Sequence, residues 1–531
     1  MKRVVVALMA AMWLAGCAGA PPKTPAIAVA QTTSPAPAAT QPTVTRPTAS
    51  VPPVTLAANI DAYIGQPQFA RADWGIAVHS LDSGKVLYRH NADRLFVPAS
   101  NAKLFTAALA LACLGNATRI TTSLYATSTH ISSKGVLRGD LILFGHGDPS
   151  LGLKDVSPDW AGRLAAALAA RGVKRVHGNL IADATYFSGQ PFGGGREADD
   201  LQTWYGAAPS ALSVEGNLVK VQVSRTSHRC CGISVTPNAA GVHIVNLTSG
   251  ATDDPLSLYR PVGSSTLYAT GQLLSRSRSR TYSLSMPDPA RTAGNLLREA
   301  MANQGITLSG NLQVLHWPRS DLELTQPGTQ AIASIDSPSI AELVEHMLKH
   351  SDNLYAQALL LQVGALAAEQ NECDLPHPPD TSAGWGLCAL HRLLAEAGIP
   401  SSAVRLAEGS GLSRRDLVTP NAAVQWLTWA VTQPWGPDLR NALPVAGVDG
   451  TLEQRFRDGA ASDNLQAKTG TLNHAYTLTG FVTDAAGDDL VFSLMLNRYP
   501  RWGVADEYPD APSPEQALDA IAKMLAQYGA G

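Results

Sequence analysis

Three short motifs carry side chains that could do covalent chemistry: Ser100-Asn101-Ala102-Lys103, Ser351-Asp352-Asn353 and Lys468-Thr469-Gly470. Each motif is short enough to arise by chance, so only the set is informative. Together the motifs offer two serine hydroxyls, two lysine amines and a carboxamide. These groups can form a nucleophile with its base, a proton relay and a substrate clamp.

The Ser-Asp-Asn motif occurs twice, at Ser351 and again at Ser462. Ser351 follows an apolar-striped helical segment and precedes another helical run, so we expect it at a junction between two helices. Ser462 follows Gly459-Ala460-Ala461 and precedes Lys468 by a few residues, which is typical of a loop that leads into a strand. We therefore assign the chemistry to the copy at Ser351.

The spacing of Ser100 and Lys103 places both on one face of a helix, because residues i and i+3 are neighbours there. A serine is inert at pH 7 unless a base removes its proton, and a lysine can be that base only if its pKa is lowered. We expect burial in an apolar helix to lower it, with help from the charge of Lys468. A helix start after Pro98 would also leave backbone N–H groups free for an oxyanion. Standing alone, the motif would fit a capped helix with an amphipathic lysine better.

The other two motifs can hold a substrate and move a proton. Asn353 can bind a substrate amide, and Ser351 can relay a proton between a lysine and a leaving nitrogen. Lys468 and Thr469 can bind a carboxylate, while Gly470 would let a substrate backbone approach the edge of a strand. The set predicts a peptide-like substrate with an anionic end.

The elements that must position these residues follow from hydrophobic period and from turn and cap signals. We predict strands at 74–81 and 85–88, a buried helix at 100–114, a helix from Ser337 (as N-cap) through Pro338 to His350, a hairpin from Ala475–Thr483 and Leu490–Asn497, and a last helix from Ser513-Pro514. Strands from both ends of the chain, with helices between them, predict an α+β fold with one sheet closed by the termini. Short strands and loops from about 115 to 325 predict a β-rich insertion.

Length and composition limit the kind of protein. The chain has 531 residues, of which 45% are hydrophobic and 16% charged, and its net charge is −3. It can bury large cores, and it lacks the basic excess that nucleic-acid binding requires, so no nucleic-acid partner is expected. The alternation of Ser and Arg at Ser275–Arg280 favours an exposed strand face over a stripe that binds an anionic polymer. No internal run reaches about 18 apolar residues, so we expect any membrane attachment at a terminus.

The N-terminus resembles a secretory signal that ends in a bacterial lipobox. Lys2 and Arg3 precede the apolar run Val4–Ala15, and Leu14-Ala15-Gly16-Cys17 follows the lipobox pattern, in which the cysteine is lipidated. An ordinary signal with an incidental cysteine is the alternative. The next segment, to about residue 56, has nine prolines among Ala, Thr, Ser and Gln, which is typical of an extended tether. By resemblance to lipoprotein sorting, Ala18 in place of Asp favours the outer membrane.

The remaining cysteines fit an oxidising compartment without requiring one. Cys373 and Cys388 enclose a short Pro/Gly-rich loop and could form a local disulfide or stay as thiols. Cys230 and Cys231 could pair with one another or elsewhere, and Cys113 in an apolar run is expected to be a buried thiol.

A histidine pair is the one feature that suggests a metal. His346 and His350 have the i, i+4 spacing of a zinc pair. No Glu and no third ligand accompany them in the required places, so we expect an exposed helix face and no metal.

The trio of motifs resembles the active site of penicillin-binding proteins and serine β-lactamases. About 250 residues separate Ser100 from Ser351 and about 117 separate Ser351 from Lys468, which resembles the penicillin-binding protein 4 type of D-alanyl-D-alanine carboxypeptidase/endopeptidase. Further matching segments are Gly139-Asp140, Gly147–Leu151, Trp204–Ala207, Leu212–Asn217, Gly409–Arg414 and Gly447–Leu452. The resemblance covers residues 57 to 530.

The resemblance implies roles for individual residues. It makes Ser100 the acylated nucleophile and Lys103 its base, with Ser351 as the proton relay and Asn353 as the amide clamp. Lys468 and Thr469, beside Gly470, form the site for the substrate carboxylate. The N–H groups of Ser100 and Thr471 form the oxyanion hole. Arg414, Asn473 and Asp183 are candidates for recognising the stem peptide, with a buried structural role as the alternative for each. No cofactor is implied. Peptidoglycan stem peptides are the implied substrates, and β-lactams the implied covalent inhibitors.

The same resemblance divides the chain. Residues 1–17 form the lipoprotein signal, 18–56 the tether, 57–115 and 325–531 a split serine β-lactamase/transpeptidase-like catalytic domain with an antiparallel sheet flanked by helices, and 116–324 an insertion of two small subdomains. A periplasmic, lipid-anchored enzyme is expected. Two rivals remain open: a β-lactamase on the same fold, and an inactive, lipid-tethered peptidoglycan-binding protein.

Overall fold

The computed structural model describes residues 55–226, 230–250, 254–274, 278–319, 324, 327–373, 377–499 and 507–529. The predicted signal, Cys17 and the predicted tether up to residue 54 lie outside the described residues, as do residues 275–277. The first described helix, α1 (Leu56–Ile64), begins after Thr55, whose hydroxyl accepts a hydrogen bond from Ala58 N. This helix therefore starts at the last residue of the predicted tether.

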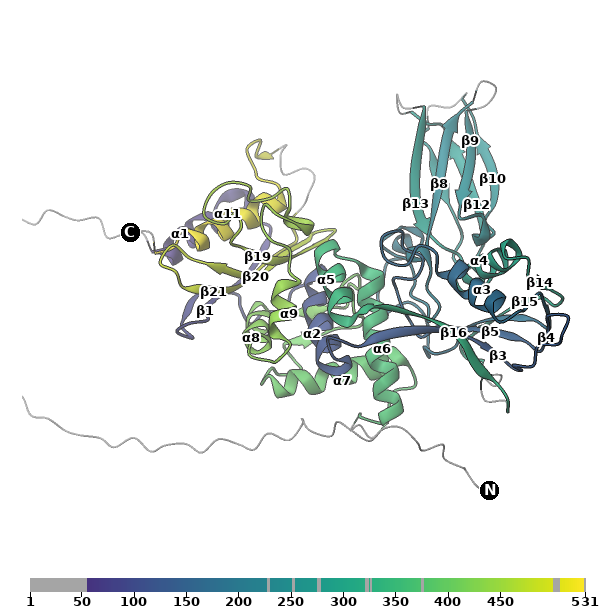
Figure 1. The fold of residues 1–531 in the computed structure, drawn as a ribbon. Helices are drawn as coiled ribbons and strands as arrows, with labels where there is room; N and C mark the ends of the chain where they lie inside the picture. The colour runs from purple at the N-terminus through teal and green to yellow at the C-terminus, as the bar shows by residue number, and fades with distance from the viewer. Residues whose placement is uncertain are drawn as a thin grey trace, which may run out of the picture. The chain divides into compact units, whose positions relative to one another are not determined.

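An antiparallel sheet joins the two ends of the described chain (Figure 1), in the strand order β19-β20-β21-β1-β2. The strands are β1 (Asp73–Ser80), β2 (Val86–His90), β19 (Gln466–Leu472), β20 (Ala475–Thr483) and β21 (Asp489–Asn497). β1 pairs with β21 along its whole length, from Asp73 opposite Asn497 to Ser80 opposite Leu490. The prediction that one sheet is closed by the termini is confirmed.

Helices cover both faces of this sheet, and the strands alternate between two cores. In β1, Ile76 and Val78 face a core with α1 and α11 (Pro514–Ala526), while Ala77 faces the other helices. The same period of two recurs in β21. Since side chains of a strand point to opposite faces in turn, an almost wholly buried strand can serve two cores.

The helices of the second core include those that carry the candidate motifs. They are α2 (Ala102–Leu114), α5 (Ile340–His350), α6 (Asn353–Gln370), α7 (Ser382–Glu396), α8 (Pro420–Ala430) and α9 (Gly436–Asn441). α2 is preceded by a 3-10 turn, η2 (Ala99–Asn101), and buries every residue from Ala102 to Leu111. The prediction of a buried helix is confirmed for residues 102–111, and residues 112–114 are half-buried.

The start predicted for the helix that ends at His350 is wrong by two residues. Strand β16 (Gln330–Ser339) runs through Ser337 and Pro338, and the N-cap is Ser339, which forms a capping box with Glu342. Pairing with β3 (Arg119–Ala126) prolongs the strand, and Ser337 Oγ accepts a hydrogen bond from Ile120 N. A partner distant in sequence therefore outweighed the local Ser-Pro signal.

The region after α2 is built mainly of strands. One five-stranded sheet has the order β15-β7-β5-β3-β16, with β5 (Leu141–Phe144), β7 (Leu180–Ala184) and β15 (Leu312–His316). α3 (Trp160–Ala170), α4 (Pro289–Asn303) and the small sheet β14-β6-β4 accompany it; these strands are Thr307–Leu308, Arg175–His177 and Val136–Arg138. Because β16 belongs to this sheet, the sheet extends past residue 324.

Two more three-stranded sheets complete this region. The first, β13-β8-β9, contains Ser279–Ser285, Leu218–Arg225 and Cys231–Thr236; the second, β10-β12-β11, contains His243–Thr248, Thr266–Gly271 and Ser257–Tyr259. At the start of β13, Ser279 and Arg280 are exposed, as the prediction of an exposed strand face requires. The remaining short elements are η1 (Pro67–Phe69), η3 (Ala198–Gln202), η4 (Glu215–Asn217), η5 (Asn238–Ala240), β17 (Val404–Arg405), β18 (Leu417–Val418) and η7 (Gly450–Leu452).

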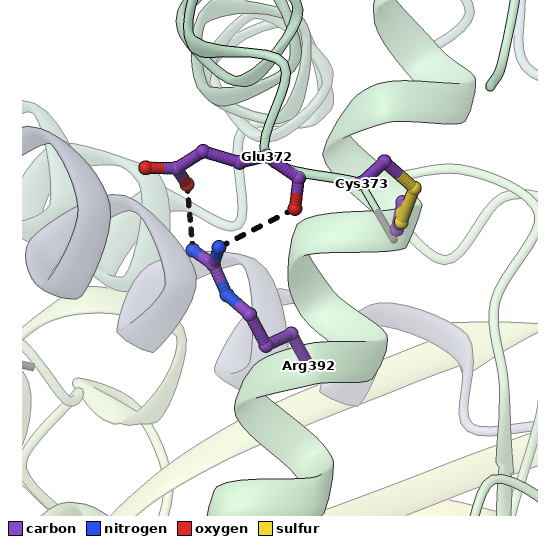
Figure 2. Close-up of a disulfide and its surroundings, with 4 residues drawn as sticks. Glu372, Cys373 and Arg392 are labelled. Carbon is purple, nitrogen blue, oxygen red and sulfur yellow. Dashed lines mark hydrogen bonds and ion pairs between the residues drawn. A yellow bond between two sulfur atoms is a disulfide. The ribbon is translucent and has the colours of Figure 1, made fainter. Parts of the chain in front are cut away.

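A disulfide joins Cys373 to Cys388 across a sequence separation of 15, with the Cα atoms 6.1 Å apart. Figure 2 shows it beside the ion pair of Arg392 with Glu372, whose atoms are 2.7 Å apart. Of the two states left open for these cysteines, the structure has the disulfide. Cys230 and Cys231 are thiols and do not pair with one another, and Cys113 is half-buried where full burial was predicted.

Candidate active site

Ser100 lies in the 3-10 turn η2, at the start of α2, and Lys103 follows in the first turn of that helix. Lys103 is completely buried, and its Nζ is 2.9 Å from Ser100 Oγ. The turn is fixed against the sheet because Thr477 Oγ1 donates a hydrogen bond to Pro98 O (2.9 Å). The structure thus brings the first predicted pair into hydrogen-bond contact.

Lys103 Nζ has two further partners, Asn353 Oδ1 at 2.5 Å and Ser410 O at 2.6 Å. Both are acceptors, so a neutral amine can donate to them and still accept the Ser100 proton on its lone pair. Burial lowers the pKa of Lys103 to about 7. At neutral pH the unprotonated amine that a general base needs is therefore well populated.

The cation that helps to lower the pKa of Lys103 is not the predicted one. After burial, the charges of Glu408 and Asp352 act to raise this pKa, and Arg196 acts to lower it. The effect runs from Lys103 to Lys468: burial, and then the charge of Lys103, lower the pKa of Lys468 well below its ordinary value. The charge of each buried lysine thus depends on its surroundings, and a substrate carboxylate would favour a protonated Lys468.

Ser351 and Asn353 lie at the junction of α5 and α6, as predicted. Ser351 ends α5 in a left-handed conformation, φ 55° and ψ 38°, and its Oγ accepts a hydrogen bond from Lys468 Nζ (2.9 Å). Asn353 begins α6, and its Nδ2 donates to Tyr205 O (2.9 Å). The second copy of the motif has another use, because Asn464 bonds the carbonyl of Thr483 in a loop.

The Lys-Thr-Gly motif lies on β19, which is the edge strand of its sheet in the described chain. Lys468 is fully buried, and Thr469 Oγ1 donates to Thr451 Oγ1 (2.8 Å). The structure shows a packing role for Gly470, and the approach of substrate at this glycine stays a prediction. A Cβ there would lie 2.2 Å from Thr477 Oγ1 and 3.0 Å from Ser100 N. The glycine therefore lets β19 pack against the turn that carries Ser100.

The remaining candidates divide into two groups. Thr471 and Asn473 are exposed at the end of β19, and Arg414 Nη1 donates to Asn473 O (3.0 Å) while its Nε meets Glu197 (3.2 Å). Asp183 is elsewhere, fully buried in β7, where its carboxylate accepts a hydrogen bond from Thr185 N (2.8 Å). Burial favours the structural alternative for Asp183, and its role toward a stem peptide stays a prediction.

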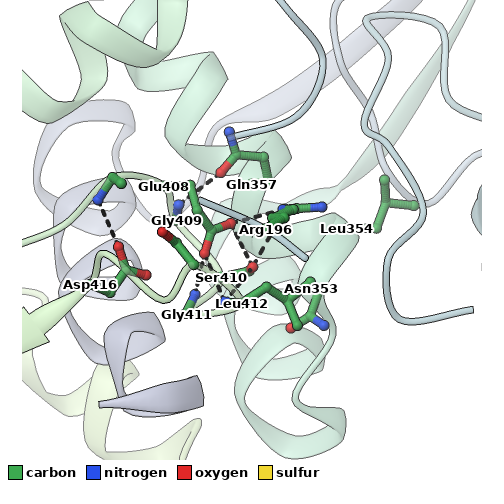
Figure 3. A network of polar contacts seen from close by, with 12 residues as sticks. Arg196, Asn353, Leu354, Gln357, Glu408, Gly409, Ser410, Gly411, Leu412 and Asp416 are labelled. Carbon is green, nitrogen blue, oxygen red and sulfur yellow. Dashed lines mark hydrogen bonds and ion pairs between the residues drawn. The ribbon is translucent and has the colours of Figure 1, made fainter. Parts of the chain in front are cut away.

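A buried network that the sequence did not reveal surrounds Ser410 (Figure 3). Glu408, which is 0% exposed, forms an ion pair with Arg196 (2.9 Å) and accepts hydrogen bonds from Gly411 N and Leu412 N. Burial by itself raises the pKa of Glu408, yet Arg196 and Ser410 hold it below its ordinary value. Glu408 stands directly before the Gly409–Arg414 segment, and this position was the only available signal.

The part of the chain that the structure describes also contains the histidine pair and a cavity away from the candidate residues. No group of three or more His, Cys, Asp or Glu side chains suitable for a metal occurs there. His346 stacks on Tyr355, with ring centroids 4.2 Å apart, and its Nε2 is 3.6 Å from Asp352. A cavity of about 820 Å³ is lined by Phe187, Arg260 and Trp317, among others, and by no candidate residue, so we attach no step of the reaction to it.

One structural observation bears on attachment to a membrane. No helix in the described ranges is long and apolar enough to cross a membrane.

An active-site serine with a lysine at i+3, a Ser-Asp-Asn junction and a Lys-Thr-Gly edge strand define the class of penicillin-recognising serine enzymes. The chain belongs to the D-Ala-D-Ala carboxypeptidase 3 (S13) family, whose model matches residues 56–526. It is a serine-type D-Ala-D-Ala carboxypeptidase of the penicillin-binding protein 4 type.

Three similar proteins illustrate the family. The chain is 31% identical over 496 residues to "D-alanyl-D-alanine carboxypeptidase" of Actinomadura sp. (strain R39), covering 89% of this chain and 85% of that one. It is 25% identical over 449 residues to "D-alanyl-D-alanine carboxypeptidase DacB" of Haemophilus influenzae, covering 82% and 88%. The crystal structure of penicillin binding protein 4 (dacB) from Haemophilus influenzae has the same fold, with a TM-score of 0.75, 23% identity and coverage of 88% and 100%.

Proposed function

We propose that Ser100 is the nucleophile that this carboxypeptidase uses and Lys103 its general base. The observation that carries the proposal is the contact of 2.9 Å between Lys103 Nζ and Ser100 Oγ, made by an amine whose pKa burial lowers to about 7. Lys103 alone can therefore supply the base that the attack of Ser100 requires. A neutral lysine can take the hydroxyl proton as the oxygen attacks.

The proposed reaction has two halves. Ser100 Oγ forms a bond to the carbonyl carbon of the penultimate D-alanine, its proton passes to Lys103 Nζ, and the oxyanion is stabilised by the N–H groups of Ser100 and Thr471. The C–N bond then breaks, and a proton passes through the Ser351 hydroxyl to the leaving amine of the last D-alanine. In the second half, water attacks the ester carbonyl carbon and gives a proton to Lys103 Nζ. That proton passes to Ser100 Oγ as the ester C–O bond breaks, which restores the serine and frees the shortened peptide.

We propose that the substrate peptide lies along β19. On its outer side β19 is bridged only at its start, where Gln466 pairs with Val445 and Ala467 N donates to Pro444 O, and no strand of the described sheet lies beyond it. An extended peptide can add to such an edge through main-chain hydrogen bonds. Lys468 and Thr469 would bind the terminal carboxylate, and the amide of Asn353 would hold the substrate amide. Arg414 and Asn473, which contact each other at the end of this strand, are the candidates for the rest of the stem peptide.

β-Lactams are proposed inhibitors that acylate the same serine. The solved structure of the Haemophilus influenzae protein "complexed with novel beta-lactam (CMV)" supports this for a chain of the same fold, with a TM-score of 0.70 and 22% identity. The lifetime of the penicilloyl-enzyme separates the proposal from a β-lactamase. A lifetime of milliseconds would make this protein a β-lactamase in practice, whereas a carboxypeptidase should hold the adduct for much longer.

We also propose that the enzyme is a periplasmic lipoprotein, attached through Cys17 and held by the Pro-rich tether, with the outer membrane as the favoured site. The lipobox Leu14-Ala15-Gly16-Cys17 and the composition of residues 18–56 support this proposal.

Product analysis tests the function. The wild-type protein and Ser100→Ala are incubated with monomeric pentapeptide muropeptides and with cross-linked dimers. We expect the wild type to release D-alanine from the monomers and Ser100→Ala to release none. Cleavage of dimers by the wild type alone would add endopeptidase activity. Equal products from both proteins would refute the serine mechanism, and no product from either would favour an inactive peptidoglycan-binding protein.

A further inference from the structure

A loop of the inserted region, residues 193–197, lies directly against the segment that precedes and contains Ser410. A Cβ on Gly193 would lie 2.1 Å from Glu408 Cβ, so only glycine permits this approach. Ser413 Oγ donates to Gly194 O (2.7 Å), and Arg414 N donates to Gly195 O (3.0 Å). The run Gly193-Gly194-Gly195 therefore brings Arg196 to a defined place beside Glu408.

The Arg196–Glu408 ion pair is closed to solvent. The side chains are 2% and 0% exposed, and Arg196 Nη2 is 2.9 Å from Glu408 Oε2. No hydrogen-bond partner is found among the described residues for the buried Nε and Nη1 of Arg196. The guanidinium is thus held by its ion pair with Glu408 and by a longer contact of Nη2 with Ser410 Oγ (3.5 Å), and a lysine at this position would keep the positive charge.

Glu408 in turn organises the backbone that touches the lysine. Its Oε1 accepts from Gly411 N (2.5 Å) and Leu412 N (2.9 Å), and its Oε2 accepts from Ser410 Oγ (2.6 Å). The carbonyl of Ser410, inside this arrangement, accepts the hydrogen bond from Lys103 at 2.6 Å. Three contacts therefore connect the inserted region to the amine beside Ser100: Arg196 with Glu408, Glu408 with Ser410, and Ser410 with Lys103.

We propose, on the basis of the function proposed above, that Arg196 is a positioning residue for the reaction. By holding the buried carboxylate of Glu408, it fixes the Ser410 carbonyl and sets the charge that faces Lys103. The inserted region thereby takes part in acylation of Ser100 without contacting the substrate. An ordinary buried ion pair would stabilise the fold and leave the proton affinity of Lys103 unchanged.

The charges around Lys103 give the proposal a direction. The groups that face it are Glu408 and Asp416 from the loop after β17, Asp352 from the start of α6, Arg196 from the inserted loop and Lys468 from β19. Burial, and then the charge of Glu408, raise the pKa of Asp416 to about 9. The charge of Glu408 acts to raise the pKa of Lys103 and the charge of Arg196 acts to lower it, so the two members of the ion pair act in opposite directions.

The test is the rate of acylation by a fluorescent penicillin, measured from pH 5 to 9 for four folded proteins. The wild type should gain rate through a midpoint near 7, as Lys103 loses its proton. Glu408→Gln removes the charge that favours protonated Lys103, so its midpoint should move down by about one pH unit. Arg196→Met removes the cation that disfavours protonated Lys103 and leaves the charge of Glu408, so its midpoint should move up by about one pH unit. At pH 6 this shift lowers the acylation rate by about tenfold. Arg196→Lys keeps the charge and should keep the wild-type midpoint.

Arg392→Met is the matched control, since it removes an arginine from an exposed ion pair with Glu372, and its pH profile should equal that of the wild type. If Arg196→Met does not fold, the midpoints of Glu408→Gln and Arg196→Lys test the proposal. An unchanged midpoint in folded Glu408→Gln, or equal loss of rate at every pH, would overturn the proposal. Failure of the wild type itself to be acylated at Ser100 would instead refute the proposed function.

Discussion

At the scale of the residue, the account depends on two buried lysines that differ in their partners. Lys103 has a serine and two acceptors within 2.9 Å, whereas Lys468 has the hydroxyl of Ser351 and the carbonyl of Thr469. Burying an ammonium ion is costly, and a lowered pKa of both amines is the expected response. One amine is thus suited to receive a proton from Ser100, and the other to receive the charge of a substrate carboxylate.

Lys103→Met should lower the rate of acylation by about 10³-fold, since a positioned base contributes between about 10² and 10⁴. The methionine fills the space without the lone pair, so the fold should persist. Acylation by a fluorescent penicillin measures the effect. Lys85→Met, which changes an exposed lysine in a turn, should react like the wild type. A Lys103→Met protein that is acylated at the wild-type rate would exclude Lys103 as the base.

Gly470→Ala should lower the rate of acylation by about 10²-fold, because its methyl group would displace the turn that carries Ser100 and a shift of about 1 Å has that effect. The clash is with Thr477 Oγ1 and Ser100 N. Gly250→Ala is the control, since no atom lies within 4 Å of its added Cβ. If Gly470→Ala changed the binding of substrate alone and left the maximal rate intact, the glycine would serve substrate approach, as the sequence first suggested.

At the scale of the element, local patterns predicted most of the catalytic part. The hairpin strand Ala475–Thr483 has the predicted bounds, and α2 is buried as its uniform apolar composition indicates. The start of α5 was missed because Ser337 and Ser339 are both good N-caps, and only the pairing of β16 with β3 decides between them. Arg196 could not have been found from the sequence, since its partner Glu408 is 212 positions away.

The disulfide between Cys373 and Cys388 should stabilise the protein by about 3 kcal/mol, because a closed loop of about 15 residues restricts the unfolded chain by that amount. The double variant Cys373→Ser/Cys388→Ser should unfold at a lower urea concentration and be insensitive to dithiothreitol. The wild type treated with dithiothreitol should match it. Equal midpoints for oxidised and reduced wild type would show that this loop adds no stability.

At the scale of the whole molecule, strands near both termini form one sheet, and the intervening helices and inserted strands are thereby held in a single closed unit. Sequence predicted this closure, because both ends carry alternating strands beside turn signals. It did not predict how the insertion is tied to the catalytic part. Those ties include single side chains, such as Asn353 to the Tyr205 carbonyl and Arg414 to Glu197, and main-chain bonds such as Arg414 N to Gly195 O.

The proposed lipid anchor is also a property of the whole molecule. Cys17→Ser should move the protein from the membrane fraction to the soluble fraction of bacteria that express it. The purified variant should keep the wild-type activity. The readout is immunoblotting of separated inner-membrane, outer-membrane and soluble fractions. Ala18→Asp is the matched variant, and we expect it to shift the protein toward the inner membrane. A Cys17→Ser protein that stays in the membrane fraction would refute lipid anchoring at this residue.

The most direct test of the central claim is the mass of the protein after brief reaction with benzylpenicillin, followed by peptide mapping. The account predicts one penicilloyl group per molecule, on the peptide that contains Ser100, and none on Ser100→Ala. The contrary result would be an adduct on another residue, or equal labelling of both proteins.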